Sequence, residues 1–192
     1  MIRNTLMFCA LSVFALATAQ ANELSPLSNL AFITLEQNAA SALNVIDWKV
    51  GDQMAFQVSV GSFGKIGTSN KAVTQDTGET IWVRNEVKML IQNETVEMEI
   101  RKSDAKIVKM IRNGQEQEIP SDKIEIISQE GTTVTVPAGT FECGHIVAKS
   151  ERIEKIELWI NPRDTVMDGG LKQAITSQGN IITLELTSFR KN

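Results

Sequence analysis

The feature that most constrains the fold is the alternation of apolar and polar residues, which runs from Asp47 to the end of the chain. In the segment ETIWVRNEVKMLI, for example, Ile81, Val83 and Val87 share one side of an extended chain and Arg84 lies on the other. Residues that favour turns interrupt this pattern at roughly regular intervals, as in antiparallel all-β domains. The pattern predicts about ten strands joined mostly by tight turns.

A sheet with one apolar face has to bury that face. One segment, residues 22–46, offers a helix to cover it, although its β-branched and Asn residues are also compatible with an irregular arm. We therefore expect a mainly β domain over residues 47–192, built as a single strongly curved antiparallel sheet that forms an unclosed half-barrel. The N-terminal helix is expected on its concave face, because five residues recur at helical spacing: Leu27, Leu30, Ala31, Thr34 and Leu35.

The first 21 residues have the pattern of a secretory signal peptide. Arg3 precedes an apolar run over residues 6–17, and small residues follow it up to Ala21. The run is shorter than the ~20 apolar residues that a membrane-spanning helix needs. We therefore expect cleavage after Ala21, no stable membrane insertion, and a periplasmic or secreted protein of a Gram-negative bacterium.

The charge of the chain disfavours nucleic acid as a partner. Its 19 basic and 23 acidic residues give a net charge of −4, and short basic clusters are interrupted by acids. Binding a polyanion requires a concentrated basic surface. Cys143 is the single cysteine after the expected cleavage site, so the exported chain cannot form an internal disulfide.

The residues that could carry chemistry are few. Cys143 and His145 are two apart and share one face of a strand, but such neighbours stand ~7 Å apart, too far for a nucleophile and its base. We expect Cys143 to be a small buried apolar residue and His145 to lie at the surface or at a strand edge. Asp164 and Asp168, in the loop segment NPRDTVMDGG, are candidates for a carboxylate pair, although solvated loop acids are favoured. We predict no catalytic residue, no metal site and no cofactor, and hence no enzyme.

Four segments carry a resemblance to a known family: DWKVGDQMAFQV, VTVPAGTFECGHIVAKSE, ELWINPRDTVMDGGLKQ and TLELTSF. They resemble exported bacterial proteins of the superfamily of periplasmic lipoprotein carriers and outer-membrane lipoprotein-sorting factors, the Lol type (LolA and LolB). The resemblance covers Trp48 to Phe189. It implies an unclosed β-barrel with helical lid elements, which encloses an apolar cavity that shelters lipid acyl chains.

On these grounds we expect a non-enzymatic periplasmic binding protein that holds a lipid or a lipid-modified partner, such as lipoprotein acyl chains, in an apolar cavity. The alternative is a structural or protein-interaction module of the cell envelope with a filled core. Met side chains adapt to variable apolar contents, although they also fill ordinary cores. The residues expected to line the cavity are Met54, Phe56, Val58, Val83, Met89, Met98 and Trp159.

Overall fold

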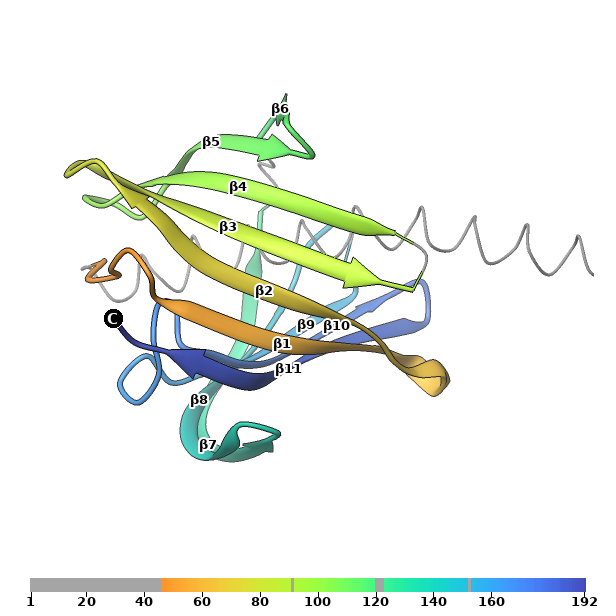
Figure 1. The fold of residues 1–192 in the computed structure, drawn as a ribbon. Coiled ribbons are helices and arrows are strands. Elements are labelled where there is room, and N and C mark those ends of the chain that lie inside the picture. The colour runs from red at the N-terminus through yellow and green to blue at the C-terminus, as the bar shows by residue number, and fades with distance from the viewer. Residues whose placement is uncertain (1–45, 91, 120–122, 152) are drawn as a thin grey trace, which may run out of the picture.

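The computed structural model describes residues 46–90, 92–119, 123–151 and 153–192. The expected signal peptide lies outside these residues, as does the helix expected over residues 22–46 except for Ile46. The described chain forms one 11-stranded antiparallel sheet (Figure 1). In chain order the strands are β1 (Gln53–Val60), β2 (Gly64–Asp76), β3 (Thr80–Met89), β4 (Asn93–Arg101), β5 (Ile107–Arg112), β6 (Gln115–Gln117), β7 (Glu125–Val136), β8 (Gly139–Lys149), β9 (Lys155–Ile160), β10 (Gly170–Ser177) and β11 (Asn180–Arg190).

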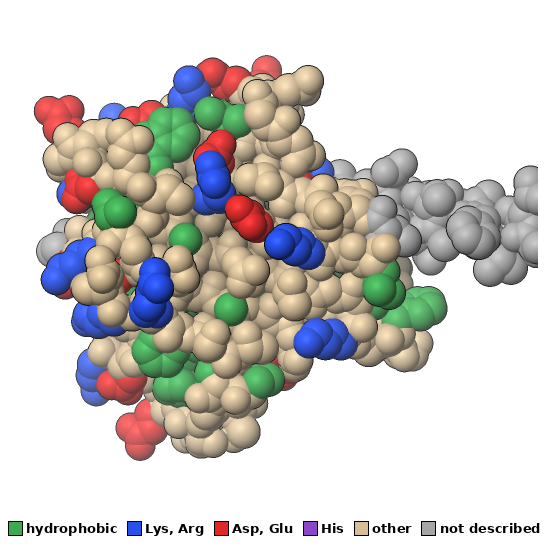
Figure 2. Space-filling model, viewed as in Figure 1, with side chains coloured by type: hydrophobic (Ala, Val, Ile, Leu, Met, Phe, Trp, Pro, Cys, Tyr) green, Lys and Arg blue, Asp and Glu red, His purple; other side chains and the backbone are tan. Residues whose placement is uncertain are grey.

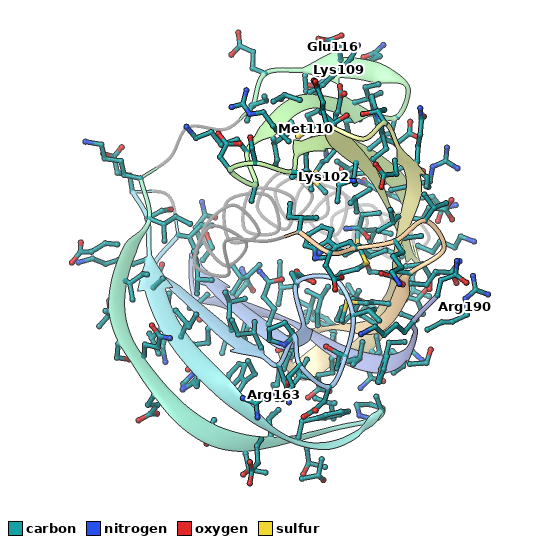
Figure 3. The ribbon with its side chains drawn as sticks, turned by 90° about the vertical axis from the view of Figure 1, so that its left-hand side faces the viewer. Lys102, Lys109, Met110, Glu116, Arg163 and Arg190 are labelled. Atoms are coloured by element: carbon teal, nitrogen blue, oxygen red, sulfur yellow. The ribbon has the colours of Figure 1, made fainter. Side chains whose placement is uncertain are left out.

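The strand order explains the shape of the sheet. Neighbours follow the order β6-β5-β4-β3-β2-β1-β11-β10-β9-β8-β7, so the first and last strands of the domain pair in the middle and the chain meanders outward on both sides. Seen end-on, the sheet curls around its concave side, while β6 and β7 remain separate edges (Figure 3). The prediction of a mainly β, unclosed half-barrel is confirmed. The sheet has eleven strands against the ten or so expected, and the shortest, β6, follows a hairpin turn at Asn113 and Gly114, where both residues have positive φ.

Alternate residues of the strands build the core. Ile81, Val83 and Val87 of β3 are buried while Arg84 is exposed, which confirms the predicted alternation. A large cluster of buried apolar side chains extends over β1–β5, β10 and β11, and a smaller one, which includes Ile156 and Ile175, lies over β8–β10. Buried apolar side chains therefore cover the concave side along most of the sheet.

The opposite, outer face carries charged side chains. On the side shown in Figure 2, acidic and basic groups are interspersed, and some are paired across strands. Arg84 of β3 contacts Glu97 of β4 at 2.7 Å, and Lys102 contacts Asp76 at 2.6 Å. Within the described ranges, no helix has the length and apolarity to cross a membrane.

The β7–β8 hairpin folds back on the sheet, and its middle part forms one wall of a pocket. β7 and β8 are joined by the tight turn at Pro137 and Ala138. The Ala138 N–H donates to the Leu186 carbonyl of β11 at 3.0 Å. Since β10 pairs with β11 only up to Glu185, the turn occupies the edge of β11 that β10 leaves open.

Candidate functional site

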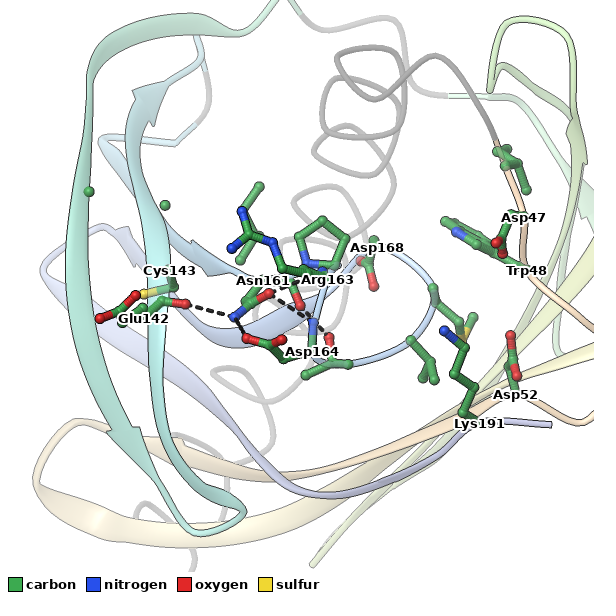
Figure 4. Close-up of a pocket in the computed structure, with 18 of the residues that line it drawn as sticks. Asp47, Trp48, Asp52, Glu142, Cys143, Asn161, Arg163, Asp164, Asp168 and Lys191 are labelled. Carbon is green, nitrogen blue, oxygen red and sulfur yellow. Dashed lines mark hydrogen bonds between the residues drawn. The ribbon is translucent and has the colours of Figure 1, made fainter.

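A pocket of about 1040 Å³ lies between the β7–β8 hairpin and the loop 161–169, which connects β9 to β10. Figure 4 shows Glu142 and Cys143 of β8 on one side of this loop, and Trp48 on the other. The pocket is built by segments far apart in sequence: the residues before β1, the middle of β7 and β8, the loop 161–169 and the C-terminal Lys191.

Two glycines hollow the β7–β8 wall of the pocket. Gly131 of β7 and Gly144 of β8 lie opposite each other in the antiparallel register, and both line the pocket. A Cβ atom added at Gly131 would meet nothing within 4 Å. A Cβ atom added at Gly144 would come no closer than 3.8 Å to the Ile160 side chain. The space in front of this wall is thus open because two facing residues have no side chain.

The side chain of Asn161 organises the loop that faces this wall. Its Nδ2 donates to the Glu142 carbonyl of β8 at 2.7 Å and to the Asp164 carboxylate at 2.6 Å (Figure 4). Its Oδ1 accepts from the N–H groups of Arg163 and Asp164, both at 3.0 Å. These bonds use both donors and both acceptor positions of the Asn161 amide. Three of them lie within the loop and one reaches β8, so the loop is fixed locally and tied to β8.

The second half of the loop is anchored in the core. The Thr165 hydroxyl donates to the Asn161 carbonyl at 2.6 Å, and Val166 and Met167 are buried in the main apolar cluster. Gly169 has a φ of +74°, and a Cβ atom there would lie 2.3 Å from the Pro162 backbone nitrogen. The close return of the chain at this point therefore requires glycine.

Asp168 joins the loop to the far side of the sheet. Its Oδ2 accepts from the ammonium group of Lys71 on β2 at 2.8 Å, and the Lys71 side chain is only 4% exposed. The other carboxylate oxygen, Oδ1, is buried without a hydrogen-bond partner within the part of the chain that the structure describes. Buried acceptors of this kind are uncommon in folded proteins. Asp168 lines the pocket, and its Oδ1 is a buried hydrogen-bond acceptor that the described residues leave unused.

Carboxylates outnumber cations around the pocket. Asp52 is already committed, because its two oxygens accept from the Lys49 and Asn192 N–H groups, each at 2.8 Å. Asp164 and Asp168 were candidates for a carboxylate pair. They bind different partners, Asn161 and Lys71. The ionisable residues that line the pocket are Asp47, Asp52, Glu142, Asp164 and Asp168 against Arg163 and Lys191.

Cys143 and His145 have separate surroundings. Cys143 is half-buried, packs against the main cluster and lines the pocket, and desolvation raises the pKa of its thiol. A raised pKa keeps the thiol protonated and weakly nucleophilic. His145 stacks on Trp159 with ring centroids 4.4 Å apart, and its side chain is only 15% exposed, so it is more enclosed than expected. Glu130 and Glu157 each lie 3.4 Å from its ring nitrogens.

The residues that the sequence predicted to line an apolar cavity lie outside this pocket. Five of them are at most 7% exposed and belong to the main cluster: Met54, Phe56, Val58, Val83 and Met98. Met89 is half-buried near the end of β3. Trp159 packs between His145 and Lys172, whose Nζ lies 5.6 Å from the centroid of the indole. Most of these residues therefore belong to the main apolar cluster, and Trp159, which packs against it, also contacts His145 and Lys172.

The residues that build the pocket carried weak sequence signals. Glycines inside strands, such as Gly131 of β7 and Gly144 of β8, mark places where a side chain is absent for packing or for access. The loop 161–169 lies within the segment NPRDTVMDGG, whose acids Asp164 and Asp168 were candidates for a carboxylate pair. The partner of Asp168 is Lys71, 97 positions away, and no local pattern could have indicated that contact.

Three solved structures compare with this fold at low sequence identity. A candidate exported protein with a YmcC-like fold from Bacteroides fragilis is 12% identical, with a TM-score of 0.52 over 77% of this chain and 99% of that protein. A protein of unknown function from Chlamydia trachomatis is 10% identical, with a TM-score of 0.49 over 76% of this chain and 89% of its own. A candidate lipoprotein from Parabacteroides distasonis is also 10% identical, with a TM-score of 0.37 over 76% of this chain and 97% of its own.

Only the first of these likenesses is close enough to support a conclusion, and at 12% identity that conclusion concerns the fold alone. This chain shares the architecture of the Bacteroides fragilis protein over nearly the whole length of that protein. No protein-family model matches the sequence, and no curated protein matches it.

Proposed function

We propose that this protein is a non-enzymatic binding module of the bacterial cell envelope, which takes its partner in the pocket between the β7–β8 hairpin and the loop 161–169. The single observation that carries the proposal is the hollow wall made by Gly131 and Gly144 opposite a loop that is fixed before any partner arrives. A preformed site lowers the entropy cost of binding.

The chemistry of the lining supports binding over catalysis. The pocket acids with described contacts hold structural partners: Asp52 binds backbone N–H groups, Asp164 binds Asn161 and Asp168 binds Lys71. The thiol of Cys143 has a pKa raised by burial, which does not suit a nucleophile. Apolar residues such as Trp48 and Ile160 add contact surface between the polar groups.

Location in the cell envelope rests on the signal-peptide pattern of residues 1–21 and on the fold shared with a candidate exported protein. A second candidate function, the holding of a lipid or a lipid-modified partner, rests on the long apolar concave face and on the resemblance to Lol-type carriers. The near-complete burial of Met54, Val83 and Met98 favours the module with a filled core over the lipid carrier.

Native mass spectrometry tests both functions. The protein is incubated separately with a detergent-free envelope extract and with a total lipid extract of the same cells, repurified, and examined for bound mass. Gly131→Trp places a large side chain in front of the hollow wall, and Gln129→Trp, two residues along the same exposed strand but outside the pocket, is the matched control.

We expect a bound mass from the envelope extract on the wild type and on Gln129→Trp, and at least tenfold lower occupancy on Gly131→Trp. A lipid that binds all three proteins equally would favour the second function. Equal occupancy of a non-lipid ligand on Gly131→Trp and the control would contradict a site in this pocket.

A further inference from the structure

The two edges of the sheet differ greatly in length. At one end of the strand order, β6 has only three residues, Gln115–Gln117. At the other end, β7 has 12 residues, Glu125–Val136, and pairs only with β8. Most residues of β7 are exposed. An edge strand of this length presents a row of backbone groups to any chain that can pair with them.

The hairpin geometry shows which backbone groups of β7 are available. Val136 and Gly139 flank a two-residue turn, and such residues form a hydrogen-bonded pair. Pairs then alternate along an antiparallel ladder, so Gln129, Gly131 and Thr133 turn their N–H and C=O groups away from β8. Among the described residues, these groups have no further backbone partner.

Irregular register, which usually prevents another chain from pairing with an edge strand, occurs only near one end of β7. The register with β8 shifts between Ile126 and Ser128, and from Ser128 to Val136 it runs without interruption. That stretch contains no Lys, Arg or Pro, the residues that commonly block pairing at edges. Next to it, Ile126 and Ile127 are each 55% exposed. The strand therefore combines an open backbone with exposed apolar side chains.

The ionisable side chains that β7 itself contributes to this edge are acidic. Glu125 and Glu130 are the ionisable residues of β7, and each side chain is 69% exposed. They face Lys149 and His145 of β8, at 3.2 and 3.4 Å. The strand also lines the acid-rich pocket through Gly131 and its neighbours. An added strand with basic residues would meet complementary charge, whereas a second copy of β7 would bring two acidic strands together.

We propose that an extended, positively charged segment of a partner protein pairs with β7 as an additional strand of the sheet, beside the pocket. The inference rests on the proposed binding function and names the class of partner. The main-chain bonds would supply affinity, and the carboxylates around β7 would select for basic residues at alternate positions of the segment.

The test uses a fluorescently labelled peptide of sequence KVTVKVTVK and fluorescence anisotropy with the whole protein. Thr133→Pro removes one outward N–H of β7 without removing a bond to β8, and Thr133→Val keeps that N–H. Three changes are each expected to weaken binding at least tenfold: Thr133→Pro, the acidic peptide EVTVEVTVE, and the basic peptide with N-methyl groups on four consecutive central amides. Thr133→Val should bind within twofold of the wild type.

The methylated peptide decides the matter if Thr133→Pro fails to fold, since it leaves the protein unchanged. Equal binding of the methylated and unmethylated peptides, or of the acidic and basic ones, would overturn the inference. Sedimentation that shows a wild-type dimer abolished by Thr133→Pro would overturn it in favour of a second copy. A ligand mass lost on Gly131→Trp but retained on Thr133→Pro, with no peptide binding, would leave the pocket function intact and reject the added strand.

Discussion

The two sides of this half-barrel share the same alternation of strand residues but differ in what lies in front of their inner faces. On β3 and β4, Val83 and Met98 lie opposite each other and are at most 1% exposed, so that wall is filled. On β7 and β8, Gly131 and Gly144 lie opposite each other and leave the wall open to the pocket. In both walls, residues that face inward alternate with residues that face outward along each strand. One side of the sheet thus buries apolar side chains where the other leaves a pocket, which is the difference that the proposed binding function uses.

The largest expected effect comes from opening a cavity in the filled wall. Met98→Ala should lower the free energy of unfolding by about 3 kcal/mol, because the buried thioether side chain leaves a void among well-packed neighbours. Urea denaturation with an unchanged m-value measures this loss. Glu97→Ala is the control on the same strand. It removes only a surface contact with Arg84 and should cost less than about 1 kcal/mol. Equal losses for the two variants would contradict the close packing of this wall around Met98.

The next effect concerns the loop that stands in front of the open wall. Gly169→Ala should cost about 2 kcal/mol or more, since the residue has a φ of +74° and the new methyl group would collide with the backbone at Pro162. Gly170→Ala is the control, because a Cβ atom there comes no closer than 3.8 Å to its neighbours. Thermal and urea unfolding of both variants check this, and similar stability of the two would show that the loop is not held as described.

A smaller, pH-dependent effect is expected on the outer face between the two walls. Lys172, and secondarily Gln57, hydrogen-bond to Glu185 and hold the pKa of its carboxyl group below the ordinary value. A depressed native pKa adds stability above the unfolded pKa of ~4.3, and this contribution disappears as the pH falls through the native pKa. Glu185→Gln should therefore cost on the order of 0.5 kcal/mol at neutral pH and less below about pH 4. Urea midpoints measured at both pH values test this, and a difference that does not change with pH would contradict it.

The smallest effect is expected where atoms are added to the open wall. Gly144→Ala should change the free energy of unfolding by no more than about 0.5 kcal/mol, because the new methyl group would meet Ile160 only at ordinary contact distance. The measurement is again urea unfolding, compared with Gly169→Ala. A loss above about 1.5 kcal/mol at Gly144 would mean that glycine is required there for the fold rather than for access.

The sequence was sufficient for the architecture because the architecture depends on local patterns. The alternation around Val83 and the hairpin turn at Asn113 and Gly114 each specify their structure within a few residues. The site depends on contacts between distant segments, such as Lys71 with Asp168 and Ala138 with Leu186, and a local pattern does not encode these. An apolar strand residue also gives no indication whether it faces a packed core or a cavity.

The account depends most on the claim that the space in front of Gly131 and Gly144 is kept for a partner. The most direct test is the occupancy of the envelope-derived ligand, measured by native mass spectrometry on Gly131→Trp and Gln129→Trp side by side. The account predicts at least a tenfold loss on Gly131→Trp, with both variants as stable as the wild type to within about 1 kcal/mol. Equal occupancy on the two variants would contradict it.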